Sequence, residues 1–496
     1  MVEDGKPGLP VVVHNPPAEV LNRMARVKNI RWVAEDLTGV AQVLAKSGVR
    51  LRLGLCLGLA ERALDAFSCT VADPSMAVAK PPAERFLVVK QRISDSGWTL
   101  PLIRLVNQDS ANALLAGELN AHGIPWNGEE YRRLMIKLLH KPERGDAYPR
   151  LADLDKQISK LFDGAKFDWR TEWAEVLDGE QTEFGTAKLT RLQDADHPAV
   201  PLVLRWRELY TLATHFGYAW EQRWTSKGHW RPRFRPASTV SGRWTAEGGG
   251  LQLPRELRSC VHAEAGRVLI RADLRQLEPR MWAHLSADGR LIKATAHSDL
   301  YAEIGKSLGM NRDTAKAAVL AAMYDDQSPL GRRTRGVLKH RFPRAMRSLE
   351  VAMARGLNGE TIRTKLGRTT PPSDELIRQA LQVARESWTQ EQQAAVRKRG
   401  RQVRNFYLQA PAAELACAIA ADLREALRCL DARLLLFLHD EFLIDAGLGE
   451  ADKIERLLPE VARAAADRVL GPAQVFFPLT IRRGQNWAVA SGTNTK

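Results

Sequence analysis

Apolar and polar residues follow three successive patterns along this chain. Residues 1 to 104 mix short apolar runs, as at 51–59 and 86–89, with helical stretches, and this mixture predicts a small α/β domain. From 105 to 225 the apolar positions recur at helical spacing, so this region is expected to be nearly all helix, with one long helix after Pro198. Glycine and proline then become frequent up to residue 260, which indicates loops and a hairpin.

Two further segments have the pattern of strands, and each carries an acidic residue. The run RVLIRADL at 267–274 contains Asp273 near its end, and the run at 434–446 is divided by Asp440 into two apolar halves, as in a hairpin. If these strands pair, the two aspartates converge, and phosphoryl transfer by two metal ions requires carboxylates that meet in space. Taken singly, Asp273 is equally well explained as the cap of a helix that begins near Gln276, and His-Asp-Glu as a polar turn.

A third segment, 311–324, has the pattern of a helix with a polar stripe. Asn311 is a suitable N-cap, and one face carries Arg312, Lys316, Leu320 and Tyr324 at four-residue steps. Cations near a helix N-terminus suit a triphosphate, because the free N–H groups and the dipole there favour anions; a solvated basic face is the alternative. The Tyr-Asp-Asp sequence at the end is not a metal-binding turn, because alanine-rich helix precedes it. Two acids at a helix C-terminus are mildly unfavourable.

Length and charge narrow the classes of protein to consider. A chain of 496 residues exceeds what one hydrophobic core supports, so about two to four domains are expected. Lys and Arg outnumber Asp and Glu by 73 to 58, and the net charge of +15 favours a polyanionic partner, nucleic acid before an anionic membrane surface. Basic segments with interleaved aromatic residues, at 222–235, 332–347 and 397–404, strengthen the case for nucleic acid.

Membrane, zinc and disulfide-rich classes are disfavoured. No apolar run approaches the roughly 20 residues of a membrane helix, and the N-terminal sequence lacks a targeting pattern, so a cytoplasmic protein is expected. The five cysteines form no CxxC motif and no cluster with histidine, which argues against a zinc site and against a disulfide framework.

Three segments together resemble the motifs of family A DNA polymerases. ADLRQLEPRMWAHLSAD (272–288) is similar to motif A, RDTAKAAVLAAMY (312–324) to motif B, and LHDEFLID (438–445) to motif C. Flanking elements agree: SGRW and LQLP within 241–254, LGR at 366–368, and GQNW at 484–487. The resemblance covers residues 105–496, and is closest to actinobacterial proteins labelled as bifunctional 3′–5′ exonuclease and DNA polymerase.

The resemblance implies an α+β, helix-rich chain with the right-hand polymerase fold. A degenerate 3′–5′ exonuclease-like α/β domain would occupy 1–104, the thumb 105–235, the palm 236–290 and 396–496, and the fingers 291–395. The implied function is DNA-templated DNA synthesis, in which a primer 3′ end is extended with dNTPs by two Mg²⁺ ions, for which Mn²⁺ could substitute. Primer–template DNA and dNTPs would be the partners, without a membrane, and the protein would lie with the nucleoid. Nothing in the sequence indicates a protein partner.

The resemblance also implies a role for particular residues. Glu278 stands at the steric-gate position, where a side chain excludes the ribose 2′-OH. Metal ligands would be Asp273 and Asp440, which with Glu441 and Lys316 form the catalytic set. Nucleotide contacts would come from Arg312, Lys316, Leu320, Tyr324, Glu278, Gln276 and His439. DNA contacts would come from Arg243, Gln252, Arg401, Asn405 and Gln409.

The chain departs from the family pattern at three positions. Leu320 stands where an aromatic residue is usual, Asp325 where glycine is usual, and Arg275 where a small residue is usual. An aromatic ring against the incoming sugar is therefore missing.

The N-terminal region lacks the acidic motifs of a proofreading exonuclease. It contains no Asp-x-Glu on a strand and no Tyr-x-x-x-Asp partner, and its aspartates Asp36, Asp65 and Asp73 are isolated and loop-like by context. Proofreading needs convergent carboxylates for its own metal ions, so it is not expected here.

Two other functions are compatible with parts of the pattern. A single-subunit RNA polymerase of the same fold would share Arg312, Lys316 and Tyr324, but Glu278 argues against it. A catalytically inactive, polymerase-like DNA-binding protein would explain Leu320 and the other departures, but the acidic residues and the motif B cations are intact.

Overall fold

The computed structural model describes residues 2–3, 6–7, 31–69, 80–141, 148–162, 198–326, 329–472 and 475–492. The chain forms two compact units, each built from three segments. The first unit comprises Met1–Gly123, Arg233–Ala246 and Ala265–Gly484, and the second comprises Ile124–Pro232, Glu247–Glu264 and Gln485–Lys496.

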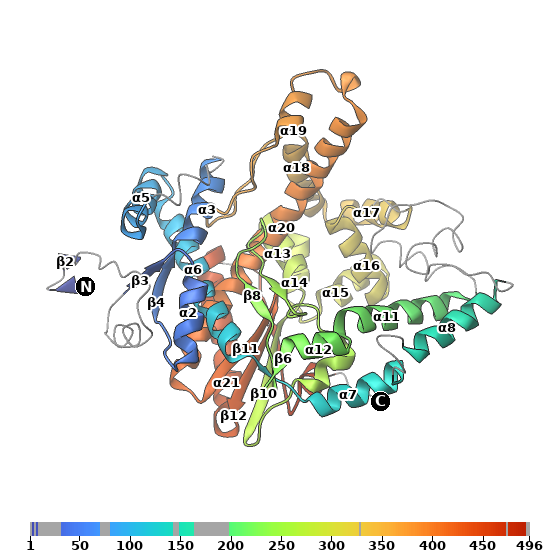
Figure 1. Ribbon diagram of the computed structural model, residues 1–496. Helices are drawn as coiled ribbons and strands as arrows, with labels where there is room; N and C mark the ends of the chain where they lie inside the picture. The colour runs from blue at the N-terminus through green and yellow to red at the C-terminus, as the bar shows by residue number, and fades with distance from the viewer. Residues whose placement is uncertain are drawn as a thin grey trace. The chain divides into compact units, whose positions relative to one another are not determined.

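A four-stranded antiparallel sheet lies at the centre of the first unit (Figure 1). Its order is β11-β12-β10-β13, with β10 at Arg267–Leu274, β11 at Ala432–Leu438, β12 at Glu441–Gly447 and β13 at Leu479–Gly484. The predicted strand at 267–274 and the predicted hairpin over 434–446 are both confirmed. Their apolar side chains are buried, because helices pack against the sheet: α20 (Gln390–Ala426) contacts β11, and α21 (Ala451–Leu470) contacts β10 and β13.

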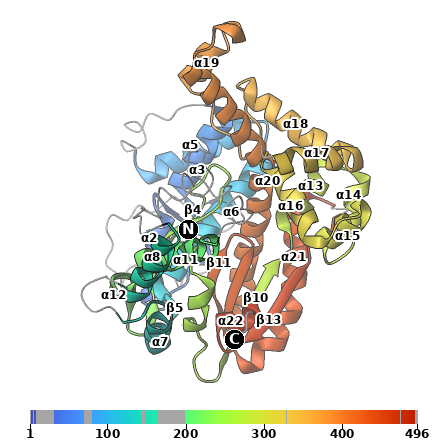
Figure 2. The same cartoon turned by 90° about the vertical axis from the view of Figure 1, so that its right-hand side faces the viewer.

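The long helix α20 is the main packing surface for the other helices of this unit. A capping box at Thr389 and Gln392 begins it, and its later turns, from Ala410 to Ala420, are almost entirely buried. It packs against α6 (Thr99–His122), α13 (Leu277–Ser286), α18 (Pro343–Leu357) and α19 (Glu375–Ala380). Figures 1 and 2 both show α18 and α20 side by side, with α19 beyond them.

The helix predicted in motif B is confirmed as α16 (Arg312–Met323). Asn311 caps it by accepting a hydrogen bond from the Thr314 amide at 2.8 Å. Its buried face is formed by small residues such as Ala315 and Ala318, so the stripe from Arg312 to Tyr324 stays exposed or half-buried. Neighbouring helices are α14 (Gly289–Thr295), α15 (Leu300–Leu308) and α17 (Pro329–Arg341).

The described part of the N-terminal region has the expected α/β character. A parallel pair, β3 (Arg31–Ala34) and β4 (Leu53–Cys56), is joined by α2 (Leu37–Lys46). Leu37, Leu44 and Leu51 form its core together with residues of α6. Other elements here are β1 (Val2–Glu3), β2 (Lys6–Pro7), α3 (Leu57–Ser68) and α5 (Pro82–Asp95).

The domain boundary expected at residue 104 falls inside α6. That helix begins at Thr99, after the N-cap residue Trp98 and two residues after Gly97, which has a φ of 70°. Pro101 lies in its first turn, where a missing N–H costs nothing. The proline therefore starts the helix, and α6 continues from the N-terminal region into the core of the unit.

The second unit combines short strands with helices around an aromatic cluster. Trp126, Tyr131, Trp220 and Trp230 lie with ring centroids 5.5 to 6.1 Å apart, and the Gly248 carbonyl accepts hydrogen bonds from two of the indoles. Its elements include β5 (Ile124–Pro125), α7 (Gly128–Leu139), α8 (Pro149–Lys160), α11 (Val200–Phe216), α12 (Tyr218–Trp224), β6 (Thr225–Ser226), β7 (His229–Trp230) and α22 (Trp487–Ser491).

The prediction of a single long helix after Pro198 is wrong. Gly217 adopts an extended conformation, with φ of −71° and ψ of −175°, and divides the segment into α11 and α12. The expectation that 105–225 is nearly all helix holds for its described residues apart from short connections; 142–147 and 163–197 lie outside them.

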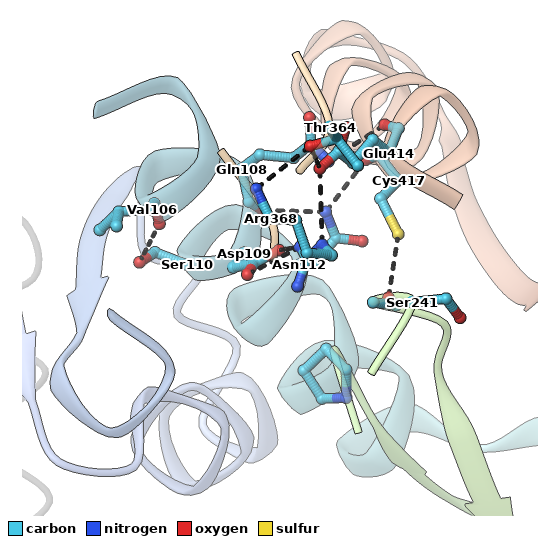
Figure 3. A network of polar contacts seen from close by, with 12 residues as sticks. Val106, Gln108, Asp109, Ser110, Asn112, Ser241, Thr364, Arg368, Glu414 and Cys417 are labelled. Atoms are coloured by element: carbon cyan, nitrogen blue, oxygen red, sulfur yellow. Dashed lines mark hydrogen bonds and ion pairs between the residues drawn. The ribbon is translucent and has the colours of Figure 1, made fainter. Parts of the chain in front are cut away.

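A buried ion network joins α6, the loop 361–373 and α20 (Figure 3). Arg368 of the LGR motif donates to both carboxylate oxygens of Asp109, at 2.7 and 3.0 Å, and its Nε lies 3.5 Å from Oε1 of Glu414. Thr364 donates to the same Glu414 oxygen at 2.7 Å. Gly242 of the SGRW motif lies against this guanidinium, since a Cβ there would be 2.6 Å from its central carbon. Two motifs far apart in sequence therefore meet at Arg368.

In this network the guanidinium of Arg368 pairs with two buried carboxyl groups, those of Asp109 and Glu414. Burial raises the pKa of Glu414 to about 7, although Arg368 opposes the rise. Because both carboxylate oxygens of Asp109 accept hydrogen bonds from Arg368, the negative charge of Asp109 is compensated. Glu414 is therefore the group that holds a proton up to neutral pH, because an ionised carboxylate in the interior needs a full counter-charge.

Replacing Glu414 with Gln tests where this proton resides. A carboxyl whose pKa is about 7 in the folded chain, above its ordinary 4.5, contributes stability that is complete below its unfolded pKa and is lost as the pH rises through 7. The melting temperature of the wild-type chain should therefore fall relative to that of Glu414→Gln as the pH rises from about 5 to about 8, measured by circular dichroism. Parallel curves would contradict the assignment.

Arg368→Met should instead lower the melting temperature at every pH. The free energy of unfolding should fall by roughly 3–5 kcal/mol, because the substitution leaves Asp109 buried without its cation.

Candidate active site

Three acidic residues gather at one end of the central sheet. The register of β10 and β12 places Asp273 directly opposite Glu441. Asp440 lies in the two-residue turn between β11 and β12, and its carbonyl accepts a hydrogen bond from the Leu274 amide at 2.9 Å. Asp273 lies within β10, while Gln276 is the N-cap residue of α13, so capping does not explain the aspartate.

The pKa values of these acids report their crowding. Burial, and to a smaller extent the charges of Asp273, Glu441 and Glu278, raise the pKa of Asp440 to about 7. Burial also raises the pKa of Asp273, and Arg271 opposes this rise. Like charges held close together in a half-buried site repel, and a cation among them relieves the repulsion.

Arg271 supplies a cation that the sequence analysis missed. Its Nη2 donates to Asp273 Oδ2 at 2.7 Å and to Glu441 Oε2 at 2.8 Å, while its Nε lies 2.8 Å from Glu441 Oε1. The available signal was its position two residues before Asp273, because residues i and i+2 of a strand share one face.

A second cluster surrounds Glu278, on α13. Its carboxylate accepts hydrogen bonds from Arg243 and from the Tyr324 hydroxyl, and Tyr324 also interacts with Gln409 on α20. Burial raises the pKa of Tyr324, and Glu278 adds to the rise. Burial lowers the pKa of His439, as does Arg243, so the imidazole is neutral at physiological pH. A cavity of about 80 Å³ is lined by Arg243, Glu278, His439 and Asp440, together with Trp244, Leu277, Ala412, Ala413, Cys417 and Phe437.

The N-terminal end of α16 is tied to the loop that follows motif A. Arg312 donates to Asp299 Oδ2 at 2.7 Å, and Gln276 donates to Asp299 Oδ1 at 2.9 Å. Although burial opposes the shift, these contacts lower the pKa of Asp299 to about 2. Gln276 has a φ of 54° and also accepts from the Leu300 amide, so it bridges the two segments. Lys316 is exposed one turn further along the helix.

Tyr301 is another residue that the sequence analysis missed. Its ring lies 5.9 Å from the Arg312 guanidinium carbon, and it is buried. Burial raises its pKa to about 12, and the charges of Glu278, Asp299 and Asp440 also act on it. Tyr301 therefore lies between the motif B cations and the acidic cluster. The only signal in the sequence was that Tyr301 comes two residues after Asp299, the N-cap of α15.

The remaining predicted residues are distributed as follows. Arg401, Asn405 and Gln409 lie at four-residue steps on α20, the first exposed and the other two half-buried. Gln252 belongs to the second unit, in a turn where its amide donates to the Gly249 carbonyl. Leu320 is half-buried on α16. Arg275 directly precedes Gln276, and its carbonyl accepts from Arg280.

The sequence analysis found two acids at the C-terminal end of α16 mildly unfavourable. One of them, Asp325, has a structural role. This residue has a φ of 56°, a conformation that Asp tolerates better than most residues. Its carboxylate pairs with Arg335 of α17 and lies 3.8 Å from Arg404 of α20. Arg404 in turn donates to the carbonyls of Ala322 and Met323 at the helix end. Two cations therefore offset the unfavourable charge of Asp325.

The carboxylates suit a divalent cation by their chemistry. Oxygen ligands of this kind are those preferred by Mg²⁺ and Mn²⁺. The pKa of Asp440 is raised by burial first and by repulsion from its acidic neighbours second, and a bound cation would offset both effects. Within the described residues, no three His, Cys, Asp or Glu side chains are already arranged around a metal-sized centre. Asp273 and Glu441 instead pair with the guanidinium of Arg271.

Comparison with known proteins shows which family the chain resembles. The model of DNA polymerase family A matches residues 156–328, which include motifs A and B. DNA polymerase I of Deinococcus radiodurans is 27% identical over 376 residues, covering 68% of this chain and 38% of the relative. The thermostable DNA polymerase I of Thermus thermophilus is 24% identical over 337 residues, covering 62% and 38%. The chain is therefore similar to DNA polymerase family A in part of its length.

The fold is also similar to that of a solved polymerase domain. The POL domain of Pol1 from M. smegmatis, solved in complex with DNA primer-template and dNTP, superimposes with a TM-score of 0.74 over 95% of this chain and 89% of that chain, at 17% identity. The helix-rich α+β chain therefore has the right-hand polymerase fold. Family A DNA polymerases use divalent metal ions. This chain spans about 38% of the length of the curated relatives named above, and no helix in its described part has the length and apolarity to cross a membrane.

The role of Asp325 can be tested by removing its charge. Asp325→Asn keeps a residue that tolerates a positive φ, but leaves Arg335 and Arg404 without their carboxylate, so we expect a loss of roughly 1–3 kcal/mol of stability. Thermal unfolding followed by circular dichroism measures it. Adding Arg335→Met to Asp325→Asn should cost less than the sum of the single changes, because the two residues share one interaction. Asp313→Asn, at the exposed start of the same helix, is the control and should change little; a strictly additive double variant would refute the pairing.

Proposed function

We propose that this chain is a DNA-templated DNA polymerase that extends a primer 3′ end with dNTPs by two-metal phosphoryl transfer. The observation that carries the proposal is the meeting of Asp273, Asp440 and Glu441 at one end of the palm-like sheet. The similarity to family A and the shared fold support the same activity. The bond between Tyr324 and Glu278 favours a deoxyribonucleotide substrate over a ribonucleotide.

In this proposal the parts of the hand follow the sequence motifs. The thumb would be 105–235, the palm 236–290 and 396–496, and the fingers 291–395. The likeness of the whole chain to a solved POL domain supports this division. Residues 1–104 would be a degenerate exonuclease-like domain, which the parallel pair β3–β4 and its helices support.

The acidic residues would serve as ligands for two Mg²⁺ ions, with Mn²⁺ as a substitute. When bound, such ions activate the primer hydroxyl and stabilise the charge on the leaving diphosphate. Asp273 and Asp440 would hold them, and Glu441 would orient the site through its place opposite Asp273. The raised pKa of Asp440 means that metal binding at neutral pH would also release a proton from it.

The motif B helix would bind the triphosphate. Arg312 and Lys316 lie in its first two turns, where the helix dipole also favours anions. Arg312 would exchange Asp299 for a phosphate, since both are oxygen anions within reach of its guanidinium. Lys316 would stabilise the charge that develops in transfer, while Gln276, His439 and Tyr324 would enclose the base and sugar. Leu320 would pack against the nucleotide without an aromatic face.

Glu278 would act as the steric gate. Two donors, Arg243 and Tyr324, hold its carboxylate in one position, and a fixed carboxylate excludes a 2′-OH more strictly than a mobile one. Primer–template DNA would be contacted by Arg243, Gln252, Arg401, Asn405 and Gln409. Because the substrate would be genomic DNA, we place the protein with the nucleoid in the cytoplasm.

The proposed enzyme would lack proofreading. Among the described N-terminal acids, Glu35 and Glu61 both pair with Arg85, and Asp36 caps α2. Asp65 was expected in a loop, but it lies in α3 and pairs with Arg92 at 2.9 Å. Asp73 lies outside the described residues. Carboxylates engaged in this way support a structural role for the domain.

Removing either proposed metal ligand tests the activity. Asp273→Ala and Asp440→Ala should each reduce primer extension by at least about a hundredfold, because chemistry loses its metal ligand, while primer–template affinity stays close to that of the wild type. Extension of a 5′-labelled primer, resolved on a denaturing gel, measures the first, and the same gel reports any shortening of a mismatched 3′ end. Asp452→Ala, an exposed acid on α21, is the control. Activity of more than a few per cent in either active-site variant would sink the proposal.

Sugar selection tests the gate. Glu278→Ala should raise the use of rNTPs relative to dNTPs by roughly tenfold or more, because the 2′-OH gains room. Tyr324→Phe should raise it less, since it removes one of the two donors that fix the carboxylate. Leu320→Phe should lower the KM for dNTPs through a new ring contact. Single-nucleotide incorporation kinetics with each dNTP and its matching rNTP provide the measurement, and an unchanged ratio in Glu278→Ala would remove the gate role.

A further inference from the structure

The cation at the centre of the acidic cluster belongs to the chain itself. We propose that Arg271 is an internal counter-cation, so that a divalent metal must displace its guanidinium from Asp273 and Glu441 in order to bind. The inference rests on the proposed function, since it concerns the same metal site. It adds a positioning residue that makes metal binding depend on the incoming nucleotide.

Arg271 occupies one carboxylate oxygen of the proposed ligand Asp273 and both oxygens of its neighbour Glu441. Nη2 bridges Oδ2 of Asp273 and Oε2 of Glu441 at 2.7 and 2.8 Å, and Nε is 2.8 Å from the second oxygen of Glu441. The guanidinium is largely enclosed, with 14% of its side chain exposed. Charge-assisted bonds of this length are among the stronger hydrogen bonds in proteins, so the metal competes with a well-made arrangement.

Arg271 competes with the metal for these carboxylates at every pH at which the protein is folded. A guanidinium stays protonated at any pH at which the protein is folded, so Arg271 leaves the carboxylates only by rotation of its side chain. While it stays, it offsets one of the three negative charges of the cluster. Both effects weaken the attraction of the free site for a divalent ion.

An incoming triphosphate would change this balance. Its oxygens bring negative charge to the same site and accept hydrogen bonds from a displaced guanidinium. Metal binding would then be weak without nucleotide and stronger with it. In this way Arg271 would keep the empty site from filling with metal, while holding Asp273 and Glu441 in place.

Binding of Mn²⁺ to the full chain in the absence of nucleotide tests the inference. Free Mn²⁺ is followed by electron paramagnetic resonance. Arg271→Met keeps the length of the aliphatic stem without its charge, and Arg271→Gln keeps a hydrogen-bond donor, so that one of the two is expected to fold even if the other does not. Each should bind Mn²⁺ about tenfold more tightly than the wild type. A non-hydrolysable dNTP analogue should narrow the difference, because nucleotide already helps displace Arg271 in the wild type.

Matched controls separate the possible failures. Arg483→Met changes a residue of β13 that is exposed, lies on the face of the sheet opposite to Arg271 and pairs with Asp452, and should leave Mn²⁺ affinity unchanged. Asp273→Asn added to Arg271→Met should abolish the tight site. Equal or weaker Mn²⁺ binding in both Arg271 variants would overturn the counter-cation, with the proposed function intact. Absence of Mn²⁺ binding in wild type and variants, with and without the analogue, would overturn the proposed metal site itself.

Discussion

The antiparallel pairing of β10 with β12 is the constraint on which the rest of the site depends. It sets Asp273 against Glu441, and the bond from the Leu274 amide to the Asp440 carbonyl brings the hairpin turn to the same edge. A shift of one residue would send these side chains to the opposite face, because side chains alternate along a strand. Buried apolar residues on both strands, such as Ile270 and Ile444, hold the register.

That pairing brings negatively charged side chains together. Arginine side chains around them reduce their mutual repulsion. Arg271 holds two of the acids, and Arg243 holds Glu278 beside them. The same device recurs in the interior, where Arg368 serves Asp109 and Glu414, and Arg424 serves Glu118. A planar, always charged group with several donors suits positions that must satisfy more than one acceptor. A buried ion pair of this kind specifies which helices meet more than it adds to stability.

The helix α20 connects the framework to the site. Its buried later turns form the core with α6 and α21, and its middle carries Arg404, which binds the C-terminal carbonyls of α16, and Gln409, which reaches Tyr324. The position of the motif B helix relative to the acids is therefore set by contacts with α20. Asp325 contributes to the same junction through Arg335 and Arg404, so a residue unusual for the family has a place in the packing.

The sequence by itself determined the strands of motifs A and C and the capped helix of motif B, because period and turn chemistry are local properties of a segment. The convergence of their acids was conditional on the pairing of these two strands, which lie far apart in the chain. Only the tertiary structure decided which partners the charged residues have. Arg271 and Glu441 are 170 positions apart, and no local pattern distinguishes such a pair from a solvated cation and a distant acid. The same holds for Asp325, whose cost at a helix end is offset by cations from two other helices. Side-chain partners depend on the arrangement in space, which is settled only when the whole core is assembled.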